Sequence, residues 1–99
     1  MELLENTHPG EILRLDFMEP LHISAGQLAK AMGLSVRRVQ EIMRGQVPAT
    51  LDIALRLGRY FRTTPQLWLN LQRSYDLEDL ERHGTAYADV VAHDEKIAA

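Results

Sequence analysis

The sequence contains no cysteine, so it can form neither a disulfide framework nor a thiolate metal site. It also lacks an apolar run of the roughly 18–20 residues that span a bilayer. Its acidic first residues do not show the basic and then apolar order of a secretory signal. We therefore expect a cytoplasmic protein without membrane contact. With 99 residues, of which 45% are hydrophobic and 25% charged, the chain can form one globular domain with a modest core.

Features of catalysis and of metal binding are missing as well. The four histidines do not share the spacing of metal ligands, and no glycine-rich phosphate loop is present. Ser35 has no His or Asp at a spacing typical of nucleophilic catalysis. Glu11, Asp16 and Glu19 resemble paired acids, but we expect them on the exposed side of an amphipathic helix. The sequence thus predicts no enzyme, no catalytic residue, no metal site and no cofactor.

Positive charge is scarce at both ends of the chain and concentrated in its middle. The formal net charge is −3, yet residues 21–75 hold eight Lys or Arg against two Asp or Glu. A basic middle between acidic ends indicates a nucleic-acid face in one part and another partner elsewhere. Chance clustering on a solvated surface would give the same distribution, and only motifs separate the two explanations.

Start and stop residues predict an all-α protein with five helices. Pro9 and Glu11 suit the first turn of a helix that must end before Pro20. Ser24, with Gln27 three residues later, has the spacing of a capping box. The other helices follow from Ser or Thr caps and from Gly or Pro near their ends. The expected helical segments are residues 9–19, 24–32, 35–44, 50–61 and 64–84.

The two short helices within residues 25–44 have the plan of a helix-turn-helix. A small residue is required where the helices cross, and Ala29 is there. The turn requires a residue that tolerates positive φ, and Gly33 supplies it. Apolar residues fall where the two helices must pack together: Leu28, Met32, Leu34, Val39 and Ile42. Because all these features are in register, the segment predicts a DNA-binding motif.

The exposed side of the second of these helices carries side chains that can read DNA. Recognition helices contact base edges mainly through their N-terminal residues, which here are Ser35, Val36, Arg37 and Gln40. Arg suits guanine, Gln suits adenine, and Val can touch a thymine methyl group. We expect phosphate contacts from basic side chains and from residues beside helix N-termini, namely Gln27, Arg38, Arg44 and Thr50. For Arg38, a solvated surface position is the open alternative.

An apolar stripe late in the chain predicts a second buried surface. Residues 67–71 are apolar on nearly every side except Asn70, which is more than one helix face can bury in a domain of this size. A two-fold homodimer is the commonest solution, with core and interface formed by Trp68, Leu69, Leu71 and Tyr75. Such a dimer places two recognition helices one DNA turn, about 34 Å, apart on a palindromic operator.

Residues 1–84 are expected to form one domain for DNA binding and dimerisation. Gly84 ends its last helix or a short successor of that helix. Residues 85–99 are rich in Ala and Asp and have few large apolar groups, so we expect a mobile or weakly helical tail. The sequence shows no internal repeat and no linker.

Selective motifs flank the helix-turn-helix: HPGEIL at 8–13, EPL at 19–21, Asp52 with ALRL at 54–57, TP at 64–65, LWLNLQ at 67–72 and YDL at 75–77. With these motifs, residues 6–78 resemble the HigA/VapI antitoxins, a branch of the lambda-repressor-like (XRE) helix-turn-helix proteins. The resemblance implies a five-helix DNA-binding domain that represses its own operon as a dimer. It also implies a partner, a small, basic, ribosome-dependent RNA-cleaving toxin of the HigB type.

The chain departs from that family pattern just after the predicted recognition helix. Relatives usually carry basic residues and Ile-Thr there, where this chain has residues 46–50 with the sequence QVPAT, and their usual Thr in the fourth helix is Ile53. Fewer positive charges weaken phosphate contact. Operator affinity or operator choice is therefore expected to differ from that of relatives.

Three functions stay open on these grounds. The first is an antitoxin that binds DNA and neutralises a toxin, and the second is a stand-alone XRE regulator without a toxin. The third is a protein-interaction module that sequesters a toxin without useful DNA binding, an option kept open by the missing basic residues. The acidic residues 76–81 are either a solvated helix face or a surface for a basic toxin.

Overall fold

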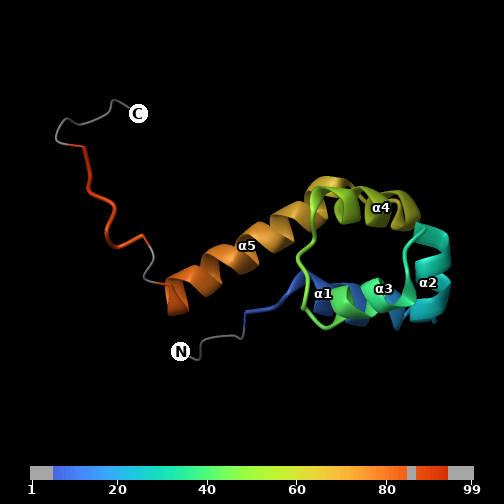
Figure 1. Cartoon of the computed structure of the whole chain (residues 1–99). Coiled ribbons are helices and arrows are strands. Elements are labelled where there is room, and N and C mark those ends of the chain that lie inside the picture. The colour runs from blue at the N-terminus through green and yellow to red at the C-terminus, as the bar shows by residue number, and fades with distance from the viewer. Residues whose placement is uncertain (1–5, 85–86, 94–99) are drawn as a thin grey trace.

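The computed structural model describes residues 6–84 and 87–93, and all regular secondary structure within them is helical. The elements are α1 (Pro9–Ile12), η1 (Leu13–Met18), α2 (Ala25–Met32), α3 (Val36–Met43), α4 (Leu51–Phe61) and α5 (Pro65–His83) (Figure 1). Because α1 runs directly into η1, the two form one N-terminal helix. The predicted all-α fold with five helices is confirmed.

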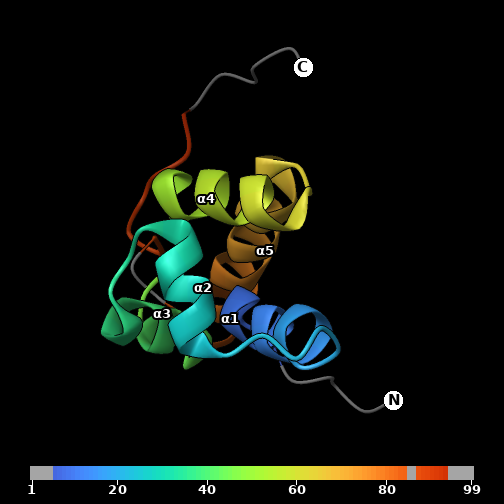
Figure 2. The same cartoon turned by 90° about the vertical axis from the view of Figure 1, so that its right-hand side faces the viewer.

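The helix-turn-helix forms as its sequence predicts. The hydroxyl of Ser24 accepts the backbone N–H of Gln27 at 3.1 Å, and the Gln27 side chain accepts the N–H of Ser24 at 2.8 Å, which completes the capping box. Gly33 ends α2 with a φ of 70°. Ser35 then caps α3 by accepting the N–H of Arg38 at 3.1 Å. Figure 2 shows α2 and α3 side by side beneath α4, with α5 behind them.

The N-terminal helix differs from the expected regular α-helix because its second half, η1, is a π-helix. The N–H of Glu19 donates to the carbonyl of Arg14 at 3.0 Å, a five-residue spacing. Leu13 and Met18, also five residues apart, are both buried. The wider turn therefore brings both side chains into the core, which the spacing of a regular α-helix does not do.

The core gathers around Trp68, whose side chain has no exposed surface. The rings of Phe17 and Phe61 lie 5.0 and 6.5 Å from the indole, centroid to centroid. The indole N–H donates to the hydroxyl of Thr63 at 2.9 Å. The prediction that Trp68 lines a dimer interface is therefore wrong. The chain itself covers this side chain completely, because η1, α4 and α5 enclose the indole.

Helix α5 is a single long helix without a separate successor. Thr64 caps its start by accepting the N–H of Leu67 at 3.2 Å, and Gly84 is its C-cap. Figure 1 shows the last part of α5 (orange) extending away from the other helices. Residues 87–93 contain a turn and no helix, whereas residues 85–86 and 94–99, which complete the expected tail, lie outside the described residues.

Candidate nucleic-acid interface

Helix α3 presents its first turn to solvent while its opposite face closes the core. Val39 and Ile42 are buried, whereas Val36 is 44% exposed, a high fraction for an apolar side chain at a helix start. The Ser35 hydroxyl uses its oxygen for the cap, so its hydrogen can still be donated to a ligand. A hydroxyl, a methyl pair and a guanidinium at positions 35, 36 and 37 thus lie together on an exposed helix start.

The two arginines near the start of α3, Arg37 and Arg38, differ in the contacts that their side chains form. Within the described structure, the Arg37 side chain is exposed and forms no ion pair or hydrogen bond. Arg38 lies 3.7 Å from the carboxylate of Glu41, a half-exposed pair of small energetic weight. Arg37 is therefore available as a fork of hydrogen-bond donors, the group that recognises the edge of guanine.

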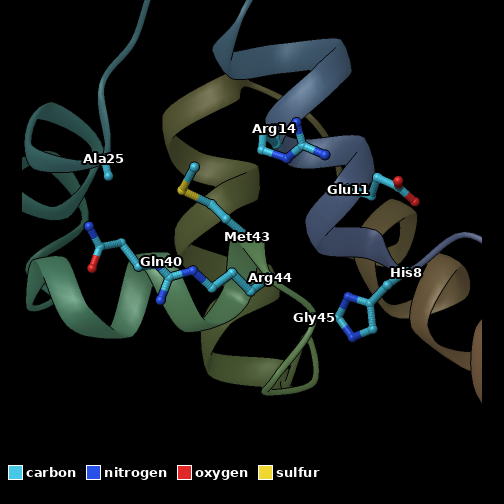
Figure 3. Close-up of a pocket in the computed structure, with 8 residues that line it drawn as sticks. All are labelled: His8, Glu11, Arg14, Ala25, Gln40, Met43, Arg44 and Gly45. Atoms are coloured by element: carbon cyan, nitrogen blue, oxygen red, sulfur yellow. The ribbon is translucent and has the colours of Figure 1, made fainter.

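Gln40 and Arg44 line a hollow between the N-terminal helix, the start of α2 and the later part of α3, and Arg37 does not border this hollow. The hollow has a volume of about 510 Å³ and is lined by His8, Glu11, Arg14, Ala25, Gln40, Met43, Arg44 and Gly45. Figure 3 shows the Gln40 amide close to Ala25 and the Arg44 side chain running back along α3 toward Gln40. These two predicted residues therefore face the start of α2.

Gln27 and Thr50 lie in the first turn of α2 and at the cap of α4, and both are exposed. The Gln27 amide still has its NH₂ group to donate, because only its oxygen serves the capping box. The Thr50 hydroxyl accepts the N–H of Ile53 at 3.3 Å and keeps its own hydrogen. Donors beside the positive ends of two helices suit phosphate oxygens.

Two side chains that we did not predict hold this surface in place. Arg56 on α4 pairs with Asp52 at 3.0 Å and also donates to the carbonyl of Met32 at the end of α2. Gln72 on α5 is 7% exposed and accepts the N–H of Ala49 at 2.7 Å, which fixes the chain just before Thr50. The four-residue spacing of Asp52 and Arg56 could have predicted the ion pair, whereas no sequence signal marked Gln72 as buried.

His8 joins the N-terminal helix to the rest of the molecule. Its Nδ1 accepts the N–H of Gly10 at 2.9 Å, which makes it the cap of α1. Its ring meets the ring of Tyr75 edge-on at 4.8 Å between centroids. Burial lowers the pKa of His8, and this outweighs the opposite influence of Asp76 and Glu11. The HPG motif therefore has a structural role at the junction of α1 and α5.

Of the predicted interface residues other than Trp68, Leu69 and Leu71 are half-buried against the core, and Tyr75 is half-buried beside His8. Only Leu69 borders the groove of about 430 Å³ along α5, together with Ala49, Gln72, Arg73, Asp76, Leu77 and Leu80. Leu77 is 56% and Leu80 is 36% exposed, although both are large apolar residues. The structure thus assembles a different set of apolar side chains on α5 from the predicted one.

The described residues contain no group of three or more His, Cys, Asp or Glu that could hold a metal ion. Among the same residues, no helix combines the length and the apolar character that crossing a bilayer requires.

Comparison with known proteins gives the family. The Helix-turn-helix family model matches residues 16–68, more than half of the chain. This chain belongs to the XRE-type helix-turn-helix family. Virulence-associated protein I of Dichelobacter nodosus is 51% identical to it over 75 residues, which cover 76% of this chain and 69% of that protein.

Solved structures of XRE-type antitoxins are similar to this chain over most or all of its length. The Pseudomonas aeruginosa antitoxin HigA, solved with the higBA promoter, has a TM-score of 0.79 and 39% identity and covers 89% of this chain and 97% of its own. The antitoxin GraA in complex with its operator has a TM-score of 0.80 and 37% identity, covering 100% and 98% of the two chains. The expected resemblance to HigA/VapI antitoxins is confirmed, and this family is not enzymatic.

Proposed function

We propose that this XRE-type protein is a sequence-specific repressor and the antitoxin of a type II toxin–antitoxin module. The observation that carries the proposal is the exposed start of α3, where Arg37 has no partner within the described structure. The P. aeruginosa HigA and GraA structures, which hold promoter or operator DNA, share its fold at 37–39% identity. Their DNA binding supports the same activity here.

In this proposal the start of α3 enters the major groove of DNA, and residues around it bind the phosphate backbone of the DNA. Arg37 reads guanine, Val36 contacts a thymine methyl group, and Ser35 and Gln40 complete the base contacts. Phosphates are bound by four residues on three helices, namely Gln27, Arg38, Arg44 and Thr50. Because Arg38 already pairs with Glu41 at 3.7 Å, its contact requires exchange of that weak, half-exposed pair.

The protein acts as a homodimer, and the groove along α5 is its contact surface. Leu69, Leu77 and Leu80 give this surface an apolar centre. Arg73 and Asp76 border the same groove with opposite charges, three residues apart. A two-fold axis that brings Arg73 of one protomer to Asp76 of the other makes this surface complementary to itself. The two recognition helices then read a palindrome.

The second partner is a small basic toxin of the HigB type, which cleaves mRNA. Outside that groove, the late part of α5 carries Glu78, Asp79 and Glu81, and residues 76–99 have more acids than bases. An acidic surface attracts a basic protein and increases the rate of association. The alternative is a stand-alone XRE regulator, in which these acids only keep the helix solvated.

Purification of the tagged protein from its native cells, with nuclease treatment and intact mass spectrometry, tests the antitoxin function. A stoichiometric small basic protein is the expected companion. The variant Arg37→Ala, which weakens DNA binding but not the α5 surface, should retain that companion. A dimer that purifies alone under conditions that preserve complexes would favour the stand-alone regulator.

A further inference from the structure

A continuous groove runs along η1 beside the recognition helix. The hollow of about 510 Å³ that holds Gln40 and Arg44 adjoins a second hollow of about 470 Å³ bordered by Met18, Glu19, His22, Ile23 and Ser24. Arg14, Ala25 and Met43 line both hollows. Arg14 therefore lies at the middle of a groove that extends from the end of α3 to the start of α2.

The two arginines that line this groove, Arg14 and Arg44, form few side-chain contacts within the described structure. The Arg44 side chain has no ion pair or hydrogen bond within the described structure. Arg14 has one ionic contact, with Glu19 at 3.7 Å, and the two side chains are 39% and 62% exposed. A pair that is this long and this exposed contributes little stability and exchanges readily for another anion.

The form of the groove favours a strand of phosphates over a single small anion. Figure 3 shows Arg14 and Arg44 on opposite sides of Met43, so the two guanidinium groups do not converge on one point. The Glu11 carboxylate points away from Gln40 and Arg44 in the same view. An extended polyanion that passes the start of α2 meets Arg44 on one side of Met43 and Arg14 on the other.

We propose that Arg14 is a DNA-phosphate contact outside the helix-turn-helix, on the strand that also passes Arg44 and the start of α2. This inference rests on the proposed DNA-binding function. It extends the interface to the N-terminal helix, and it supplies positive charge that the QVPAT segment after α3 lacks. Phosphate contacts carry no base preference, so Arg14 strengthens binding to every sequence alike.

The test is the salt dependence of binding to two duplexes, one selected for tight binding and one with the same bases scrambled. Arg14→Gln should weaken binding to both duplexes several-fold, and the slope of log affinity against log salt should become shallower by about 0.9. Arg14→Lys should largely keep the wild-type slope because it keeps the charge. Arg59→Gln is the matched control, since Arg59 is exposed near the end of α4, away from this groove.

Glu19→Gln separates a phosphate contact from a structural role. If Arg14 binds phosphate, removing the carboxylate at position 19 frees the guanidinium, and affinity stays the same or rises. If Arg14 acts only through its pair with Glu19, Glu19→Gln should reproduce the loss seen with Arg14→Gln, and this result would overturn the inference. An unchanged slope in Arg14→Gln would also overturn it, while DNA binding by the wild-type protein would still support the proposed function. Thermal melting of each variant confirms that it is folded.

Discussion

Gly10 lies so close to the carbonyl oxygen of Ile42 that a Cβ atom at position 10 would clash with that oxygen. The N-terminal helix and the recognition helix are therefore in backbone contact at this point. The HPG motif serves this contact, because His8 caps the helix, Pro9 occupies its first position and Gly10 permits the close approach.

Gly10→Ala should destabilise the fold by about 1–3 kcal/mol, because the added methyl group meets backbone rather than a flexible side chain. Urea unfolding measures the change. Gly26→Ala is the matched control, since a Cβ there would meet only the Ser24 hydroxyl at 3.9 Å. That control should be neutral or slightly stabilising, as Ala replaces Gly within a helix. Equal stability of the two variants would contradict the close contact.

Arg37→Ala should weaken binding to a selected operator by about 1–3 kcal/mol and relax the preference at one base position. The loss follows from removing the proposed bidentate contact to guanine. Fluorescence anisotropy on operators substituted at each position measures both effects, and Arg59→Ala should bind as wild type. A uniform loss on all sequences would instead identify Arg37 as a phosphate contact.

Leu77→Ser combined with Leu80→Ser should shift the protein from dimer to monomer. Both side chains are exposed in the single chain, so their loss removes apolar contact area from the proposed interface rather than from the core. Analytical ultracentrifugation gives the mass. Leu55→Ser on α4, where Leu55 is 50% exposed, is the control and should remain a dimer. A double variant that keeps the dimeric mass would place the interface elsewhere.

Trp68→Ala, unlike the double variant of Leu77 and Leu80, should change the stability of the single chain, because Trp68 lies in the core. Loss of the buried indole should reduce the free energy of unfolding by about 3–5 kcal/mol. Denaturant unfolding at several protein concentrations separates this intrinsic loss from any effect of dissociation. Wild-type stability of the variant would contradict the central place of Trp68 in the fold.

Acidification should destabilise the junction at His8. Its pKa lies below the ordinary histidine value of 6.5 in the folded state, so the unfolded chain binds the proton more readily. The contribution of His8 to stability is complete well above pH 6.5 and decreases as the pH falls from there through the folded-state pKa. His8→Asn keeps a capping side chain but does not titrate. The difference in unfolding free energy between wild type and this variant should therefore change over that pH range, and a constant difference would contradict the prediction.

The parts of the fold that could be predicted from sequence are those encoded within a few residues. Ser24 with Gln27, Gly33, Ser35 and Thr50 each mark a helix boundary through a local hydrogen bond or a local backbone conformation. Those boundaries, and with them the helix-turn-helix, follow from the chain without knowledge of its packing.

The parts that could not be predicted depend on contacts between distant segments. The π-helix of η1 depends on burying both Leu13 and Met18, and periodicity alone gives no such requirement. In α5, nearly every position from 67 to 71 is apolar, so the sequence could not assign Trp68 to the core rather than to the interface. Gln72 resembles an exposed helical glutamine until its contact with Ala49, 23 residues earlier, is seen.

Selection of duplexes from a randomised DNA library by the wild-type protein tests the central claim most directly. We expect enrichment of a palindrome whose half-sites are about 10 base pairs apart, since in the proposed dimer each protomer places the start of α3 in one major groove. The same selection with Arg37→Ala should enrich a palindrome in which one base pair of each half-site is no longer specified. That result would support base reading by Arg37. A library that shows no enrichment after repeated rounds would contradict sequence-specific binding through α3.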